Sequence, residues 1–175
     1  MKLTNLREHM KEEEIDALLI TSAYNRRYMT DFTGTAGVVL ISASDAVFIT
    51  DFRYTEQAEK EIEGFRIVLH TKTIQEEVAT QVKAMNVGTL GFEKDDLSYG
   101  LYETYSKAVE SDMKPVSGLV EKLRMVKNED ELAILKKAAS IADDAFDHII
   151  TFIRPGITEL DVSNELEFFM RKLGA

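Results

Sequence analysis

Cysteine is absent from this chain of 175 residues, and histidine occurs only three times. Without cysteine the chain can form neither a disulfide framework nor a thiolate for catalysis or zinc binding, so any nucleophile or metal ligand must be an oxygen or imidazole group. The lack of cysteine also fits a cytoplasmic protein, because reducing compartments do not favour disulfides. His9 and His70 are isolated from each other and from His148, so the histidines predict no shared site.

Basic side chains are in deficit, with 21 Lys and Arg against 31 Asp and Glu and a formal net charge of -10. This balance argues against a nucleic-acid partner, which needs a basic surface to neutralise phosphates, and equally against an acidic membrane surface. Long hydrophobic runs are missing too, so the sequence predicts no membrane span and no secretion signal. With 45% hydrophobic and 30% charged residues, it is typical of a soluble globular protein.

The first two thirds of the chain alternate between helical and strand-like patterns. Leu3, Leu6 and Met10 recur at helical spacing and precede an apolar run of strand length. The same reading predicts further strands at 38–42, 46–50, 65–69, 88–92 and 113–116, and helices at 53–62, 74–85 and 99–109. The polar break at 43–45 favours an antiparallel hairpin. We therefore expect an α/β fold whose mixed sheet is flanked by helices.

The last part of the chain predicts two amphipathic helices. Asn128 followed by Glu131 resembles a capping box, and Thr158 begins a second helix after Pro155. The expected apolar stripes are Leu132, Leu135, Ala139, Ala142, Phe146 and Ile149 on the first helix, and Val162, Leu166, Phe169 and Leu173 on the second. We place a domain boundary here, giving residues 1–124 and 125–175. Because nothing in the chain follows to cover these stripes, we expect a truncated enzyme.

Two clusters of acidic side chains have a possible role as sites and a plainer structural explanation. Asp144 and His148 are four residues apart and could share a metal with Asp143 and Asp147, but a solvated helix face is favoured because no second cluster completes the coordination. Paired carboxylates at Asp95 and Asp96 could act as acid and base, although a polar turn explains them better.

Two loops between predicted strands are more specific. Gly34–Gly37 lacks the lysine of a phosphate loop and precedes a strand, so it favours a backbone turn with unusual dihedral angles. Residues 24–32 are expected to form a loop crowded with aromatic rings and guanidinium groups, which either carries recognition or packs the sheet's edge. Asp51 is expected to cap the next helix and to pair with Arg53.

Taken together, residues 25–37 and 50–58 resemble the N-terminal domain of the Xaa-Pro peptidases, the family of aminopeptidase P, prolidase and creatinase. Residues 123–132, 138–143 and 154–159 resemble the family's entry into its catalytic domain. The resemblance implies a creatinase/prolidase N-terminal domain followed by the first two helices of an α+β pita-bread domain.

The resemblance also implies a metallopeptidase that hydrolyses bonds to proline with two divalent ions, commonly manganese, held by two Asp, one His and two Glu. Those ligands lie downstream of Ala175 in the family pattern, so this chain is expected to hold no catalytic or metal-binding residue and to be inactive alone. The alternative is a freestanding dimerisation or binding module.

In the family, the N-terminal domain supports a homodimer and gates access of proline-containing peptides to the active site. By resemblance, Tyr28, Phe32, Thr35 and Arg53 lie on or near that gating surface. Asp31 stands where the family often has Gly, which bears on the neighbouring Phe32.

Overall fold

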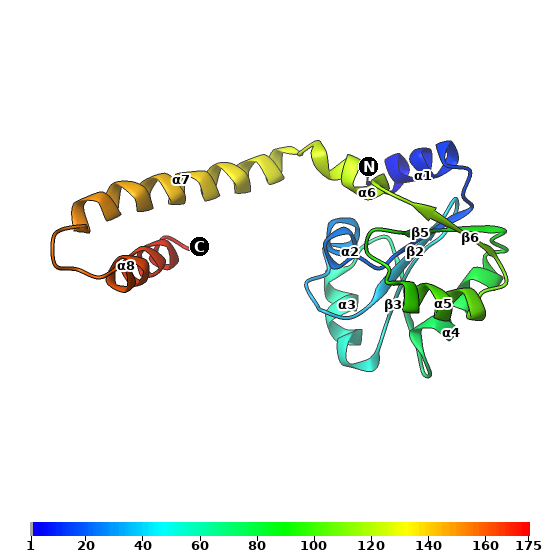
Figure 1. The fold of residues 1–175 in the computed structure, drawn as a ribbon. Helices are drawn as coiled ribbons and strands as arrows, with labels where there is room; N and C mark the ends of the chain where they lie inside the picture. The colour runs from blue at the N-terminus through cyan, green and yellow to red at the C-terminus, as the bar shows by residue number, and fades with distance from the viewer. Residues whose placement is uncertain (1) are drawn as a thin grey trace. The chain divides into compact units, whose positions relative to one another are not determined.

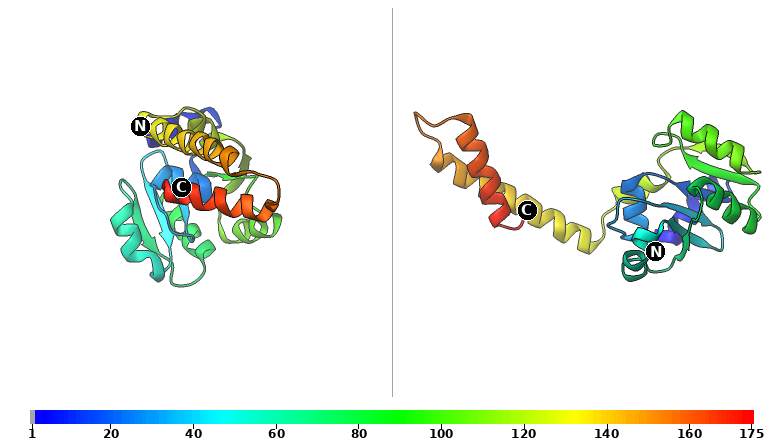
Figure 2. Two further views of the ribbon diagram at one scale, coloured as in Figure 1. Left: turned by 90° about the vertical axis from the view of Figure 1, so that its left-hand side faces the viewer. Right: turned by 90° about the horizontal axis from the view of Figure 1, so that it is seen from below.

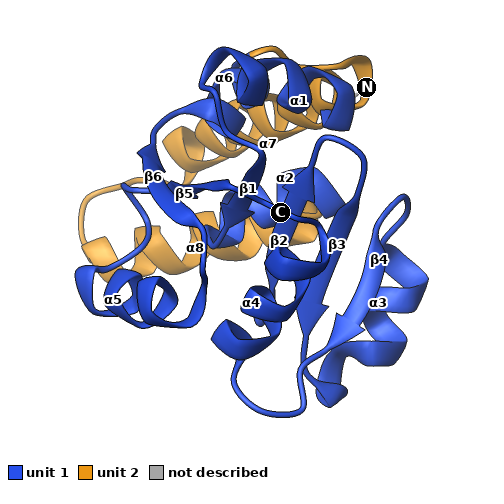
Figure 3. Cartoon of the chain, turned by 90° about the vertical axis from the view of Figure 1, so that its right-hand side faces the viewer, with its two compact units in different colours: residues 1–125 blue, residues 126–175 orange. Residues whose placement is uncertain are grey.

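The computed structural model describes residues 2–175, which separate into two compact units (Figures 1 and 3). Unit 1 comprises residues 1–125 and unit 2 residues 126–175. Figure 2 shows the helices of each unit from two further directions.

Unit 1 alternates helices and strands along its whole length. Its elements are α1 (Lys2–Glu12), β1 (Ala17–Ile20), α2 (Ala23–Thr30), β2 (Val38–Ser42), β3 (Ala46–Thr50), η1 (Phe52–Tyr54), α3 (Thr55–Glu61), β4 (Arg66–Leu69), α4 (Ile74–Ala84), β5 (Thr89–Glu93), α5 (Tyr99–Ala108), β6 (Asp112–Val116) and α6 (Leu119–Met125). The predicted α/β fold with a mixed sheet flanked by helices is confirmed.

The six strands form one sheet in the order β4-β3-β2-β1-β5-β6. The hairpin of β2 and β3 is antiparallel, as predicted, and β2 is also antiparallel to β1. The pairs β3–β4, β1–β5 and β5–β6 are parallel. All strands except β2 therefore run in one direction, and their carboxyl ends lie along a single edge of the sheet.

Successive side chains of the central strands point into two separate cores, one on each face of the sheet. Leu18, Val39 and Phe48 pack with residues of α1, α2, α3 and α6 on one face. Leu19, Leu40 and Val47 pack with residues of α4 and α5 on the other. Because both faces are covered, these strands read as continuous apolar runs rather than as alternating ones.

Two segments of unit 1 differ from the expectation. Residues 23–30 form helix α2 and not a loop, and residues 119–125 form helix α6, which was not among the predicted helices. The start of α2 depends on a distant residue, because Glu93 at the end of β5 accepts hydrogen bonds from the backbone N–H groups of Thr21 and Ser22. The residues next to α2 in the sequence do not predict these hydrogen bonds.

Unit 2 is a pair of helices, α7 (Glu129–Phe152) and α8 (Glu159–Lys172), which turns back on itself after residue 152 (Figure 2). Both predicted capping boxes are present, Asn128 with Glu131 and Thr158 with Asp161. Of the apolar stripe predicted for the first helix, Leu132, Leu135 and Phe146 are exposed, as expected for a stripe that nothing in the chain covers. The buried residues of α7 are Ile141, Ala145 and Ile149. These residues are buried because α8 packs on their side of α7, and hydrophobicity alone does not distinguish them. Within residues 2–175 no helix is long and apolar enough to cross a membrane.

Candidate functional site

Two loops meet at the sheet edge where the carboxyl ends of the parallel strands lie. Asp51 directly follows β3, and Gly37 directly precedes β2, which runs the opposite way. Val38 pairs with Ile49 across the two strands, so the loop before β2 and the turn after β3 are neighbours. In open α/β sheets this edge is the usual place for binding residues.

Tyr54 connects three of the four residues expected at the gating surface. Its hydroxyl lies 2.6 Å from Thr35 Oγ1, its ring centroid 5.8 Å from that of Phe32, and its ring 5.4 Å from Arg53 Cζ. Phe32 is only 1% exposed, and its ring packs against that of Phe48 with centroids 4.7 Å apart and planes tilted by 60°, so it supports the surface from beneath. Tyr54 itself was not selected as a site residue, although it follows Arg53 directly in the sequence.

The fourth residue, Tyr28, lies against α1. It is half-buried, Lys2 Nζ sits 4.8 Å from its ring centroid, and the same amine donates a 2.6 Å hydrogen bond to the Tyr28 carbonyl. Asp31 pairs with Lys2 at 3.1 Å and has a φ of 58°, in the left-handed region that glycine occupies without strain. A glycine would adopt this backbone conformation without strain.

Asp51 holds the Arg53 guanidinium in a forked arrangement, as the sequence predicted. Its carboxylate accepts from Arg53 Nε at 2.9 Å, from Nη2 at 2.8 Å, and from the Arg53 backbone N–H at 3.0 Å, which also caps the short helix η1. These hydrogen bonds lower the pKa of Asp51 to about 2. The Arg53 side chain remains 61% exposed, and the adjacent Phe52 ring is 81% exposed, so both are available to a ligand.

Replacing Arg53 with glutamine is expected to raise the pKa of Asp51 from about 2 toward its ordinary value of 3.8. Because the folded pKa is depressed, the pair stabilises unit 1 above pH 3.8, and that contribution is lost as the pH falls toward 2. NMR titration of the carboxyl carbon measures the shift directly. The same titration of Asp51 in an Arg66→Gln variant is the control, since Arg66 pairs with Asp45 instead. An Asp51 midpoint unmoved by Arg53→Gln would contradict the assignment.

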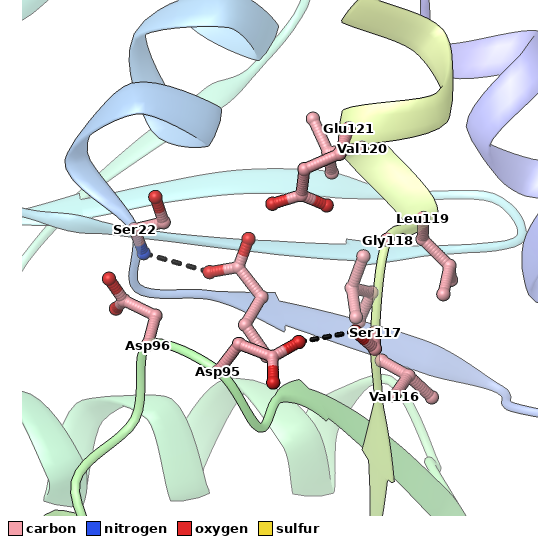
Figure 4. Close-up of a pocket in the computed structure, with 11 residues that line it drawn as sticks. Ser22, Asp95, Asp96, Val116, Ser117, Gly118, Leu119, Val120 and Glu121 are labelled. Carbon is pink, nitrogen blue, oxygen red and sulfur yellow. Dashed lines mark hydrogen bonds between the residues drawn. The ribbon is translucent and has the colours of Figure 1, made fainter.

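A small cavity of about 160 Å³ lies at the same edge, between β5, β6, α2 and α6 (Figure 4). Glu93 projects into it and accepts hydrogen bonds from Thr21 N at 2.7 Å, Ser22 N at 2.8 Å and Asn25 Nδ2 at 2.6 Å. Burial raises the pKa of Glu93. Asn25 is fully buried, and the same amide nitrogen donates to Glu121 at 2.5 Å while its oxygen accepts from Arg124 at 2.9 Å. Glu93 was not predicted as part of a site, and Asn25 was included only as a member of the 24–32 segment.

The predicted polar turn at Asp95 and Asp96 is confirmed, and both carboxylates are engaged in structural hydrogen bonds. Asp96 accepts from the Thr21 hydroxyl at 2.7 Å, and Asp95 accepts from the Ser117 hydroxyl. They join the loops around the cavity, which is a structural role.

The possible metal ligands on α7 do not converge. His148 Nε2 lies 2.7 Å from Glu165 on α8, and its imidazole stacks on Phe169 at 4.0 Å between centroids. Asp143, Asp144 and Asp147 are exposed. Over residues 2–175, no group of three or more His, Asp or Glu side chains is placed to hold a metal ion.

The chain matches two family models in sequence. The Creatinase/Prolidase N-terminal domain matches residues 2–126, and metallopeptidase family M24 matches residues 133–175. An uncharacterized peptidase of Bacillus subtilis, YqhT, is 49% identical over 100% of this chain and 50% of that protein.

Solved structures agree with this assignment. The Xaa-Pro dipeptidase from Bacillus anthracis is 56% identical with a TM-score of 0.96, over 99% of this chain and 49% of that one. The N-terminal domain of the cytoplasmic peptidase PepQ from Mycobacterium tuberculosis is 28% identical with a TM-score of 0.65, over 70% of this chain and 97% of that one. The chain thus spans about half the length of the full-length relatives. The predicted resemblance is confirmed: this chain belongs to the creatinase/prolidase N-terminal domain family and continues into metallopeptidase family M24.

Proposed function

We propose that this chain is the N-terminal accessory portion of a metal-dependent Xaa-Pro peptidase. Residues 1–124 form the accessory domain, and residues 125–175 form the linker and the first helices of the catalytic domain. The observation that carries this proposal is the 99% coverage of the chain, at 56% identity, by the first half of an Xaa-Pro dipeptidase. The separately solved PepQ domain, which matches 70% of the chain, supports a boundary in this region.

The accessory domain gates proline-containing peptides and supports a homodimer in the cytoplasm. Arg53 supplies the gating chemistry, because its guanidinium is 61% exposed and a guanidinium suits a carboxylate. Thr35 is linked to Arg53 by Tyr54, which contacts both residues. The buried Phe32 ring packs under Tyr54, and Tyr28 lies farther along the surface, against α1.

Hydrolysis in the whole enzyme depends on two divalent ions, with manganese as the expected metal. The side chains of residues 2–175 do not form a ligand set for such ions, so we assign no catalytic step to them. A metal would supply an activated water and would polarise the scissile carbonyl in the part of the enzyme that holds it. This chain is therefore proposed to be inactive by itself.

A chimera tests the proposal directly. Joining this chain to the C-terminal half of the Bacillus anthracis dipeptidase is expected to give manganese-dependent hydrolysis of an Xaa-Pro dipeptide, whereas the 175-residue chain alone gives none. In the chimera, Arg53→Ala is expected to raise KM by about tenfold, because a charged hydrogen bond contributes about 1.5 kcal/mol or more.

Arg66→Ala is the matched control, since Arg66 is a half-exposed arginine paired with Asp45 at 2.8 Å at the start of β4. Its KM is expected to equal that of the unmodified chimera. Metal-dependent cleavage by the purified chain alone would refute the inactive-fragment part of the proposal. Equal KM values for the Arg53 and Arg66 variants would refute the gating role.

A second candidate function, a freestanding dimerisation or binding module, is favoured by the apolar surface of unit 2. Ile134, Phe146 and Phe168 are 69%, 64% and 70% exposed. Burying one such side chain contributes about 1.5–3 kcal/mol, so a surface of this kind favours association.

The 175-residue chain is expected to self-associate through residues 128–173, and a chain ending at Lys127 is expected to lose that part of the association. Sedimentation velocity at several concentrations measures both species. A full-length variant with Ile134→Glu and Phe168→Glu is the control for chain length, and it should shift toward monomer. An unchanged oligomeric state after truncation at Lys127 would argue against both association through unit 2 and the binding-module function.

A further inference from the structure

We propose that Arg26 is a positioning residue that sets the conformation of the gating loop, defined as residues 33–37. Its guanidinium donates hydrogen bonds to backbone carbonyls of this loop and thereby keeps Thr35 in contact with Tyr54. The functional meaning of the inference rests on the proposed gating role of Thr35, but the positioning itself does not.

Arg26 is a buried cation whose hydrogen-bond acceptors come from the loop. Its side chain on α2 is 5% exposed, Nη1 donates to the Gly37 carbonyl at 2.7 Å, and Nη2 donates to the Gly34 carbonyl at 3.1 Å. Its buried Nε–H has no hydrogen-bond partner in the described part of the chain. Burial lowers the pKa of Arg26. Backbone carbonyls of the loop therefore provide the solvation that water would otherwise give this charge.

Every residue of the gating loop is bound by a side chain from elsewhere in unit 1. Glu61 accepts from Thr33 N at 2.8 Å, the Tyr54 hydroxyl meets Thr35 at 2.6 Å, and the Thr50 hydroxyl donates to Ala36 O at 3.0 Å. Arg26 supplies the contacts to Gly34 and Gly37. It therefore fixes both glycines that flank the central pair Thr35 and Ala36.

Close contacts at Gly34 and the backbone conformation of Gly37 restrict the conformation of the gating loop. A Cβ at Gly34 would lie 2.8 Å from the Tyr54 ring and would overlap Phe32, and Gly37 has a φ of 140°. The backbone thus lies directly on the aromatic pair. If the loop lifted away, Arg26 would lose both of its carbonyl acceptors, which is unfavourable for a charged group. The cation and the closed loop therefore stabilise each other.

The geometry requires arginine and not merely a positive charge. A planar guanidinium presents donors in a fixed fork that can reach two carbonyls at once, whereas a lysine ammonium can approach only one of these sites well. Arg26→Lys is therefore expected to keep the fold and to hold the loop loosely, and Arg26→Met to release it.

NMR of the full 175-residue chain with labelled threonine methyl groups tests the inference. The nuclear Overhauser contact between the Thr35 methyl and the Tyr54 ring is expected to be strong in the unmodified chain, weaker in Arg26→Lys and lost in Arg26→Met. The order parameter of the Thr35 methyl should fall in the same order, while that of the Thr89 methyl in β5 stays constant. If Arg26→Met does not fold, Arg26→Lys provides the same comparison. Unchanged Thr35 signals in a folded variant would overturn the proposal.

The chimera distinguishes this inference from the proposed function. Arg26→Lys in the chimera is expected to raise KM several-fold with kcat unchanged, whereas general destabilisation would lower the active fraction and hence kcat. Thr35→Ala is measured in parallel. A lost Thr35–Tyr54 contact with normal KM in both variants would establish Arg26 as a positioning residue and refute the gating role of Thr35.

Discussion

Replacing Phe48 with alanine is expected to destabilise unit 1 by about 3–5 kcal/mol, the usual cost of deleting a fully buried phenylalanine ring. Phe48 is 0% exposed in the middle of β3 and packs against Phe32 at 4.7 Å. A Cβ at Gly37 would lie 2.7 Å from its ring, so the ring also supports the end of the gating loop. The substitution therefore removes the packing that supports both Phe32 and the end of the gating loop.

Urea unfolding followed by tyrosine fluorescence measures this loss in unit 1 alone, because all six tyrosines lie between Tyr24 and Tyr105. Phe52→Ala is the matched control, since the Phe52 ring is 81% exposed and its removal should change the free energy of unfolding by about 0.5 kcal/mol or less. Similar losses for the two variants would mean that β3 is not packed as described.

Replacing Asn25 with aspartate is expected to cost about 2–4 kcal/mol at pH 7, although the two side chains have the same shape. The fully buried Asn25 amide donates to Glu93 at 2.6 Å and to Glu121 at 2.5 Å. An ionised carboxylate has no donor, so the substitution places a third negative charge against two others. Arg124, which donates to the Asn25 oxygen, offsets only part of this repulsion.

The deficit of the Asn25→Asp variant is expected to shrink as the pH is lowered from 7 toward 5. Burial already raises the pKa of Glu93 above its ordinary value of 4.5, and an added carboxylate raises it further. The folded state then binds more protons than the unfolded state in the pH range above 4.5, so the variant loses stability as the pH rises through that range.

Urea unfolding by tyrosine fluorescence at pH 5, 6 and 7 follows the trend. Asn5→Asp on the exposed face of α1 is the control and should be close to neutral throughout. A deficit that is independent of pH would show that the carboxylates around Asn25 do not interact in the folded state.

The sequence predicted best where the signal was local. The apolar runs at 38–42 and 46–50 with the polar break between them predicted the hairpin, and Asn128 and Thr158 predicted two helix starts, because turns and helix caps both act within a few residues. The pairing of Asp51 with Arg53 was equally local, since the two residues are two positions apart.

The errors arose where a distant residue supplied a partner. At the start of helix α2, the backbone N–H of Ser22 donates to Glu93, which is some seventy positions away in the sequence. Helix α6 is held by hydrogen bonds of Asn25 with Glu121 and Arg124. The buried face of α7 does not follow from the sequence, because apolar residues occur on more than one side of the helix and only the position of α8 decides between them.

The residues by themselves determined the α/β class of unit 1, the strand pairing of its hairpin, the capped helices of unit 2 and the peptidase family. Tertiary structure decided how the residues of the proposed gating surface are arranged: it buried Phe32, placed Tyr28 against α1, and made Tyr54 the link between Thr35 and Arg53. It also enclosed Arg26 beneath the loop that it holds. Patterns along a chain report which faces are apolar, whereas hydrogen bonds between distant side chains form only after those faces have packed.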